Sequence, residues 1–152
     1  MFVTRTKIAA GSLALVSGVA LLASPAEAQV NRCAQKFGAS YRVIDSGYVK
    51  HGRTIYGVAY LAYSTSQKAN CAWTEKRLFR GKKTFVSVTL TRQSDGVPEY
   101  QGMDWVSYAG PVKLTGTARV KVKLQAEMWN KDFDHKSTAT KATYSSGWYH
   151  GG

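Results

Sequence analysis

The chain contains few residues of the kinds that form catalytic and metal sites. Among its 152 residues there are 3 histidines, 2 cysteines and 9 acidic side chains. No histidine pair has metal-binding helical spacing, no serine lies in a nucleophile-elbow motif, and no two carboxylates have a spacing that singles them out as an acid and a base. The segment 132–135, "DFDH", offers metal ligands, but its flanking lysines favour a solvated charged turn. We expect no catalytic residues, no metal, no cofactor and no enzymatic activity.

Long apolar runs are scarce, and the clearest one stands at the N-terminus. Arg5 and Lys7 precede an uncharged run over 8–23, and Ala26 and Ala28 are the small residues that a signal peptidase requires. The run is short for a bilayer core, which needs roughly 20 apolar residues. We expect 1–28 to be a cleaved signal peptide and the protein to be secreted, with a membrane anchor as the alternative.

Cysteine is scarce as well, and two cysteines alone cannot complete a structural zinc site of four ligands. In an exported chain an even pair is a disulfide candidate. We expect Cys33 and Cys71 to be bonded to each other, which closes a loop of about 38 residues and contributes roughly 4 kcal/mol in the chain-entropy model. Such a bond would attach the N-terminus of the exported chain to its first sheet.

Convincing helical periodicity is absent after residue 28, where apolar residues recur with a period of two. We predict an all-β fold, either a sandwich or a partly open barrel, in one domain over 29–136. Ser46-Gly47 is expected to close the first strand, and Gly110-Pro111 to bend or end another. The predicted strands are 41–45, 54–64, 71–76, 84–92, 103–112 and 113–125. The segment 137–152 is predicted to be a polar tail with an edge strand followed by disorder.

Acidic residues are few relative to basic ones, 9 against 21, which gives a net charge of +12. Loss of the signal peptide would leave 19 basic and 8 acidic side chains, or +11. The expected partner is therefore an anionic wall or spore-surface polymer, with nucleic acid possible but less favoured. The alternative is that the lysines only keep a secreted protein soluble.

One strictly alternating segment predicts where the anion would bind. Val120, Val122 and Leu124 are expected to face the core. The cations between them would then form an outward row, and a basic turn would extend it. The predicted binding residues are Arg119, Lys121, Lys123, Arg80, Lys82 and Lys83. The alternative is that these cations protect a sheet edge from pairing with other chains.

Aromatic residues are plentiful on the predicted strands. Tyr56, Tyr60 and Tyr63 share one strand, and Trp73, Trp105, Trp129 and Trp148 lie in or near others. Exposed aromatic rings between cations can stack on sugars or bases. In an all-β domain of this size, we favour a role in the core for most of them.

Several short motifs follow Cys33 in a fixed order: "YRVIDS" at 41–46, "YLAYS" at 60–64, "NC" at 70–71 and "YAGPV" at 108–112. Together they resemble the spore-associated protein A family of small secreted actinobacterial proteins. The resemblance implies an exported protein found with spores or outside the cell, and it supplies no catalytic residue set. After "YAGPV" the chain departs from the family, since the segment around Trp129 has no cysteine.

These observations favour a secreted, non-catalytic protein of the spore or cell surface that binds an anionic polymer. The alternative is a small secreted enzyme or enzyme inhibitor that acts at the cell wall.

Overall fold

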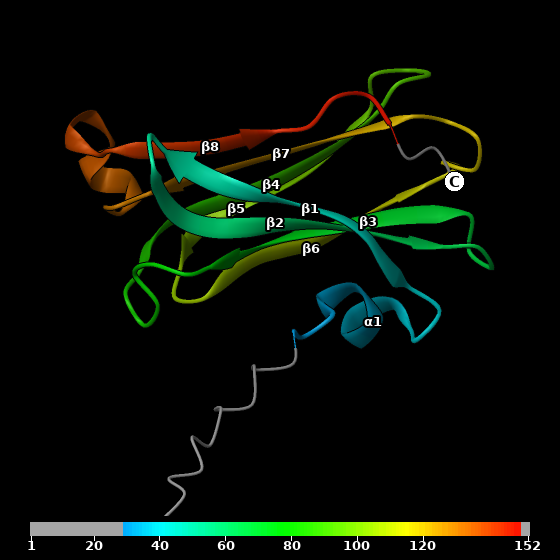
Figure 1. Cartoon of the computed structure of the whole chain (residues 1–152), viewed down its shortest axis with the longest axis horizontal. Coiled ribbons are helices and arrows are strands. Elements are labelled where there is room, and N and C mark those ends of the chain that lie inside the picture. The colour runs from blue at the N-terminus through cyan, green and yellow to red at the C-terminus, as the bar shows by residue number, and fades with distance from the viewer. Residues whose placement is uncertain (1–28, 150–152) are drawn as a thin grey trace, which may run out of the picture.

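The computed structural model describes residues 29–149. The predicted signal peptide, 1–28, and the last residues of the predicted tail, 150–152, lie outside this range. Within it the chain forms eight strands, a short α-helix and a 3-10 helix (Figure 1). The elements are α1 (Arg32–Phe37), β1 (Arg42–His51), β2 (Thr54–Ser64), β3 (Ala69–Lys76), β4 (Thr84–Arg92), β5 (Pro98–Trp105), β6 (Tyr108–Thr115), β7 (Val122–Trp129), η1 (Phe133–Thr138) and β8 (Lys141–Ser145).

The eight strands form one antiparallel sheet that curls into a nearly closed barrel (Figure 1). The strand order is β5-β4-β7-β8-β1-β2-β3-β6, so the two end strands, β5 and β6, follow each other in the chain. Across the gap between them, the Gly110 N–H donates to Gln101 Oε1 at 2.5 Å. The predicted all-β fold is confirmed, in the form of a partly open barrel.

Alternation along the strands places apolar side chains inside the barrel. Val86, Val88 and Leu90 of β4, with Val122 and Leu124 of β7, are at most 1% exposed. Burial of each such side chain stabilises the fold by about 1.5 to 3 kcal/mol before entropy is counted. The strand predictions for 54–64 and 84–92 are confirmed with their boundaries, because their apolar pattern is continuous and turn residues flank it.

A fully buried lysine, Lys76, lies inside one end of the barrel. Its ammonium donates to Lys82 O at 3.0 Å, Thr84 Oγ1 at 2.6 Å and Trp105 O at 2.5 Å. Three acceptors for three N–H groups offset the cost of removing the ammonium from water. Burial lowers the pKa of Lys76 to about 8, and the nearby Asp104 carboxylate opposes that shift. Lys76 thereby joins β3 to β4 and β5.

The first strand is longer than predicted. β1 continues through Ser46 and Gly47, and its register against β2 shifts between Val43 and Asp45. The Ser46-Gly47 pair therefore lies in a strand and does not close one. A Cβ at position 47 would lie 2.0 Å from the Tyr144 ring, so glycine serves close packing here.

Two predicted strands over 103–125 have wrong boundaries. The chain bends at Val106 and Ser107, and it turns again over 116–121, which gives three strands. The Gly110-Pro111 pair lies within β6, opposite a register shift in β3. A buried threonine fixes the second turn, since Thr117 Oγ1 accepts the Asn70 N–H at 2.9 Å. That partner lies 47 residues away, so local alternation could not reveal it.

The predicted edge strand in the tail is in fact internal. β8 lies between β7 and β1, pairing with β7 over five residues and with β1 at Lys50 and Thr143. The domain boundary predicted at 136 is therefore wrong, since β8 completes the sheet. Its small polar residues suggested an edge because they belong to the outer face of the barrel.

Candidate functional site

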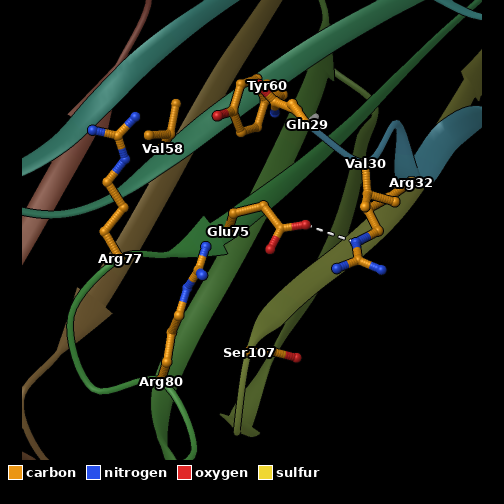
Figure 2. A pocket seen from close by; sticks show the side chains of 9 residues that line it. All are labelled: Gln29, Val30, Arg32, Val58, Tyr60, Glu75, Arg77, Arg80 and Ser107. Carbon is orange, nitrogen blue, oxygen red and sulfur yellow. Dashed lines mark hydrogen bonds and ion pairs between the residues drawn. The ribbon is translucent and has the colours of Figure 1, made fainter. Parts of the chain in front are cut away.

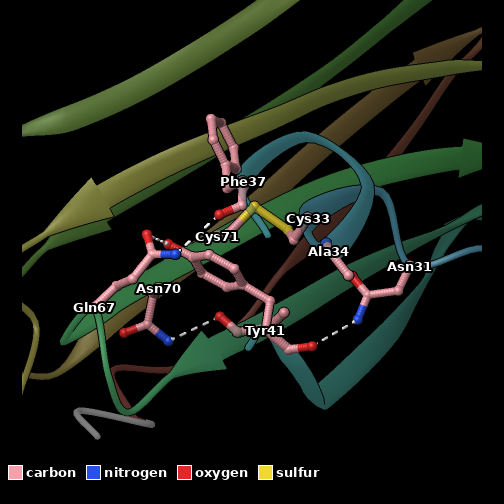
Figure 3. Close-up of a disulfide and its surroundings, with 9 residues drawn as sticks. Asn31, Cys33, Ala34, Phe37, Tyr41, Gln67, Asn70 and Cys71 are labelled. Atoms are coloured by element: carbon pink, nitrogen blue, oxygen red, sulfur yellow. Dashed lines mark hydrogen bonds between the residues drawn. A yellow bond between two sulfur atoms is a disulfide. The ribbon is translucent and has the colours of Figure 1, made fainter. Parts of the chain in front are cut away.

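The predicted disulfide is confirmed and fastens α1 to the barrel (Figure 3). Cys33 and Cys71 are bonded, with their Cα atoms 6.0 Å apart. Asn31 caps the helix by accepting the Ala34 N–H at 2.9 Å, and its side-chain amide donates to Tyr41 O at 3.1 Å. This arrangement fixes the start of α1 against β3 and β6, where Arg32 contacts Glu75 and Tyr108.

Apolar side chains under α1 form a second core outside the barrel. Tyr41, Val58, Tyr60 and Trp73 are buried there with the disulfide. The Tyr60 and Trp73 rings stack with their centroids 5.0 Å apart. Burial raises the pKa of the Tyr41 hydroxyl. These rings are core residues, as predicted for most of the aromatics.

Beside this second core lies a groove of about 600 Å³ (Figure 2). It is lined by Arg32 from α1 and by Arg77 and Arg80 from the loop after β3, and we call it the arginine groove. Glu75 is the one carboxylate among its described lining residues. In Figure 2 the Glu75 carboxylate points toward Arg32, and Arg77 and Arg80 lie on its other side. Three guanidinium groups and one carboxylate therefore line the described part of the groove.

Arg32 is held by two contacts. Its Nε donates to Glu75 Oε1 at 2.6 Å, and both side chains are mostly buried, with exposures of 22% and 14%. Its Cζ lies 4.1 Å from the centroid of the Tyr108 ring. The charge of Glu75 is thus engaged by Arg32 at one side of the groove.

The two loop arginines are positioned by different partners. Arg80 Nε donates to Lys76 O at 2.7 Å. The Cζ of Arg77 lies 5.3 Å from the centroid of the Tyr48 ring. Among residues 29–149 no carboxylate forms an ion pair with Arg77. Arg77 therefore adds a positive charge that Glu75 does not neutralise.

The predicted cationic residues fall into two separate groups. Arg80, Lys82 and Lys83 precede β4 at Thr84, whereas Lys123 pairs with Thr91 near the other end of the same strand. Seven residues at about 3.3 Å each place those ends roughly 23 Å apart. The structure thus brings Arg80 to the arginine groove and does not join the two groups into one patch.

The three cations predicted to form an outward row, Arg119, Lys121 and Lys123, do not lie along one strand. Arg119 lies in the turn before β7 with φ of 61°, and Lys121 is exposed beside it. Lys123 is half-buried on β7, with its Nζ 5.9 Å from the centroid of the Trp148 ring. The three cations are therefore separate surface charges.

Sequence reasoning missed Arg32 and Arg77. A signal was present, because Arg32 precedes Cys33, and Glu75 lies four residues after Cys71 on the same strand face. The bond between the two cysteines brings Arg32 to the face of β3 that carries Glu75. The position of Arg77 followed from no comparable pattern, since it depends on how the loop after β3 folds back.

Groups with acid, base or metal-binding chemistry are dispersed. Within 29–149 no three His, Cys, Asp or Glu side chains converge as metal ligands. In the predicted charged turn, Asp132 caps η1 and lies 2.5 Å from His135 Nδ1. That hydrogen bond lowers the pKa of the Asp132 carboxyl. Asp132 and His135 thus bond to each other within the turn, and Asp132 also caps the 3-10 helix.

None of the helices in the described range is long and apolar enough to cross a membrane.

Comparison with known proteins identified no relative of this chain. The chain matches no protein-family model, no curated protein and no solved structure.

Proposed function

We propose that the protein is a secreted, non-catalytic binding protein that holds an anionic wall or spore-surface polymer in the arginine groove. The observation that carries this proposal is that Arg32, Arg77 and Arg80 line one groove in which Glu75 is the one carboxylate among the described lining residues. The groove has a local excess of positive charge, and it is large enough to admit part of a polymer chain.

Arginine suits this role better than lysine does. Its planar guanidinium can donate two parallel hydrogen bonds to a carboxylate, sulfate or phosphate group. The contacts of Arg32 with Glu75 and Tyr108 reduce the freedom that side chain would lose on binding. The polymer would occupy Arg77 first, because Arg32 is already paired with Glu75 and no carboxylate in the described range forms an ion pair with Arg77.

Charges around the groove favour capture of a polyanion. Lys82 and Lys83 are exposed on the same loop as Arg80, and the whole chain carries +12. Such an excess raises the rate at which an anionic partner arrives, more at low salt than at high salt. Arg119 and Lys121, at the other end of β4, would contribute only to this long-range attraction.

The placement outside the cell rests on three supports. The N-terminal segment has the pattern of a signal peptide. The Cys33–Cys71 bond suits an oxidising compartment. The resemblance to the spore-associated protein A family adds the spore or cell surface as the place of action.

The test is a titration of the protein with two soluble polyanions, heparin and polyglutamate, at several salt concentrations. We expect Arg77→Gln/Arg80→Gln to bind at least about tenfold more weakly. Its affinity should also depend less steeply on salt, because fewer counterions are released per complex. The matched control is Arg119→Gln/Lys121→Gln, which removes the same charge from the distant turn.

Equal weakening in both double variants would show that net charge alone matters and would refute a defined site. Hydrolysis of a wall fragment that is lost in Asp45→Asn or Glu75→Gln protein would favour the alternative of a small enzyme. Loss of that hydrolysis in Glu75→Gln protein would make the groove a catalytic site, which contradicts the non-catalytic role proposed here.

A further inference from the structure

A second groove, of about 410 Å³, lies on the opposite group of strands, β4, β5, β7 and β8. It is on the outer face of the sheet, since Val86 and Val88 of β4 point into the barrel core. Its lining is rich in hydroxyl, amide and carboxylate groups that can bond to sugar hydroxyls. These polar side chains are Ser87, Thr89, Gln125, Glu127, Thr143 and Ser145.

An exposed aromatic ring, that of Tyr100, lies along one side of this groove. Tyr100 pairs with Thr89 and is 57% exposed. A Cβ at Gly102, two residues further along β5, would lie 2.0 Å from the Tyr100 hydroxyl oxygen and 2.6 Å from Cζ. The ring therefore lies over Gly102, and it can do so because that residue has no side chain.

The groove also has a second aromatic surface. Phe85 and Trp129 line it, with their ring centroids 4.2 Å apart. Phe133 stacks on Trp129 at 5.7 Å and is 47% exposed. The Tyr100 ring lies over Gly102, which pairs with Ser87, and Ser87 and Phe85 are two residues, or about 7 Å, apart on β4. The two aromatic surfaces are therefore close together, and polar side chains of β4, β7 and β8 lie beside them.

The charges in this groove are balanced, in contrast to the rest of the protein. Glu127 is its one carboxylate among the described lining residues, and it accepts a hydrogen bond from Trp129 Nε1. Lys141 Nζ lies 3.9 Å from the same carboxylate oxygen. Desolvation and the Glu127 charge raise the pKa of Tyr100. A tyrosine hydroxyl is neutral at pH 7 without such a shift. A polyanion would gain little here.

We propose that this groove binds an uncharged oligosaccharide, with one sugar ring stacked on Tyr100. A pyranose presents C–H groups on its faces and hydroxyls around its rim, and this groove combines an aromatic face with side-chain donors and acceptors. An exposed aromatic patch with a polar rim is typical of a binding surface. The site is separate from the arginine groove and does not depend on that groove's function.

The experiment titrates the disulfide-intact protein with cellohexaose and with the hexamer of N-acetylglucosamine, by calorimetry. We expect at least one hexamer to bind. Tyr100→Ala should weaken that binding at least about tenfold. Gly102→Ala should weaken it too, because the added Cβ displaces the ring while the tyrosine remains. Tyr100→Phe should bind within about threefold of the wild type, since it keeps the stacking face.

The matched control is Met103→Ala. Met103 belongs to the same strand and is 58% exposed, but it pairs with Val86 and belongs to the other face of β5. We expect this variant to bind like the wild type. Unfolding curves of each variant separate loss of the site from loss of the fold.

The proposal is wrong if neither hexamer binds more tightly than about 10 mM. It is also wrong if folded Tyr100→Ala protein binds as the wild type does, or if Met103→Ala weakens binding equally. Loss of heparin binding in Tyr100→Ala, without loss of oligosaccharide binding, would show that this face belongs to the anionic site and would overturn the proposal.

Discussion

Outward aromatic rings on the two sides of the barrel differ in exposure according to what covers them. On β2 and β3, α1 and the disulfide cover Tyr60 and Trp73, which are at most 9% exposed. On β5, Tyr100 is 57% exposed over Gly102. Phe85 and Trp129, on the same side as Tyr100, are at most 7% exposed and contact Phe133. Whether an outward aromatic ring becomes core or surface is thus decided by a covering element, and the strand pattern alone does not reveal it.

The two sides also differ in charge. The arginine groove, beside the covered side, holds three guanidinium groups and one carboxylate. On the open side Glu127 and Lys141 balance each other. This difference is why we assign an anionic polymer to the first groove and an uncharged oligosaccharide to the second.

The largest expected effect on stability comes from removal of the disulfide that fastens α1 to the barrel. Cys33→Ser/Cys71→Ser protein should lose about 4 kcal/mol of unfolding free energy, because the open chain gains loop entropy when it unfolds. Urea denaturation measures the loss. Tyr100→Ala, on the open side, is the comparison and should change stability by less than about 0.5 kcal/mol. A disulfide effect below about 1 kcal/mol would mean that α1 covers its side without a covalent link.

A second prediction sharpens the contrast between charges at the surface and the charge inside the barrel. Burial lowers the pKa of Lys76 from 10.5 to about 8 in the folded protein. Between these two pH values the unfolded chain binds more protons, so stability should rise with pH, by up to about 3 kcal/mol in total. The rise should occur between pH 8 and pH 10.5, and below pH 8 Lys76 should add no pH dependence because it is protonated in both the folded and the unfolded chain.

Lys76→Met isolates this contribution, because it fills the site without a titrating group. The difference in unfolding free energy between wild type and variant should shift in favour of the wild type as pH rises through that window. A difference that stays constant with pH would show that Lys76 keeps its ordinary pKa despite its burial.

The smallest effect concerns a hydrogen bond between the segment after β8 and β1. The Tyr149 hydroxyl donates to Asp45 Oδ2 at 2.5 Å, and the Asp45 carboxylate also accepts the Ser46 N–H at 2.7 Å. Asp45→Asn should cost about 1 kcal/mol, the usual net value of such hydrogen bonds. Tyr149→Phe measured alone and in the double variant gives the coupling. Additive effects of the two substitutions would indicate that this bond does not contribute to stability.

Much of the fold was predictable from local pattern. An apolar run on both faces identified β2, apolar alternation identified β4, and the single pair of cysteines gave the disulfide. The turn at 116–121 was not predictable, since Thr117 bonds to a distant backbone N–H. The internal position of β8 was hidden as well, because pairing between β7 and β1 is a long-range property that small polar residues do not encode.

The candidate sites were less predictable than the fold. Arg80, Lys82 and Lys83 were identified as binding residues from their charge, but Arg32 reaches the groove only through the disulfide. The exposure of Tyr100 depends on the absence of a side chain at Gly102. Such features require both the strand register and the neighbouring side chains, and neither is contained in composition or spacing.

The most direct test of the account is amide chemical-shift mapping of one ¹⁵N-labelled sample with heparin and of another with the oligosaccharide hexamer that binds. We predict that heparin shifts resonances in 31–33, 75–81 and 107–108, and that the hexamer shifts those in 85–89, 100–102 and 125–129. Two ligands that shift the same set of amides would contradict the claim that the barrel carries two distinct binding surfaces.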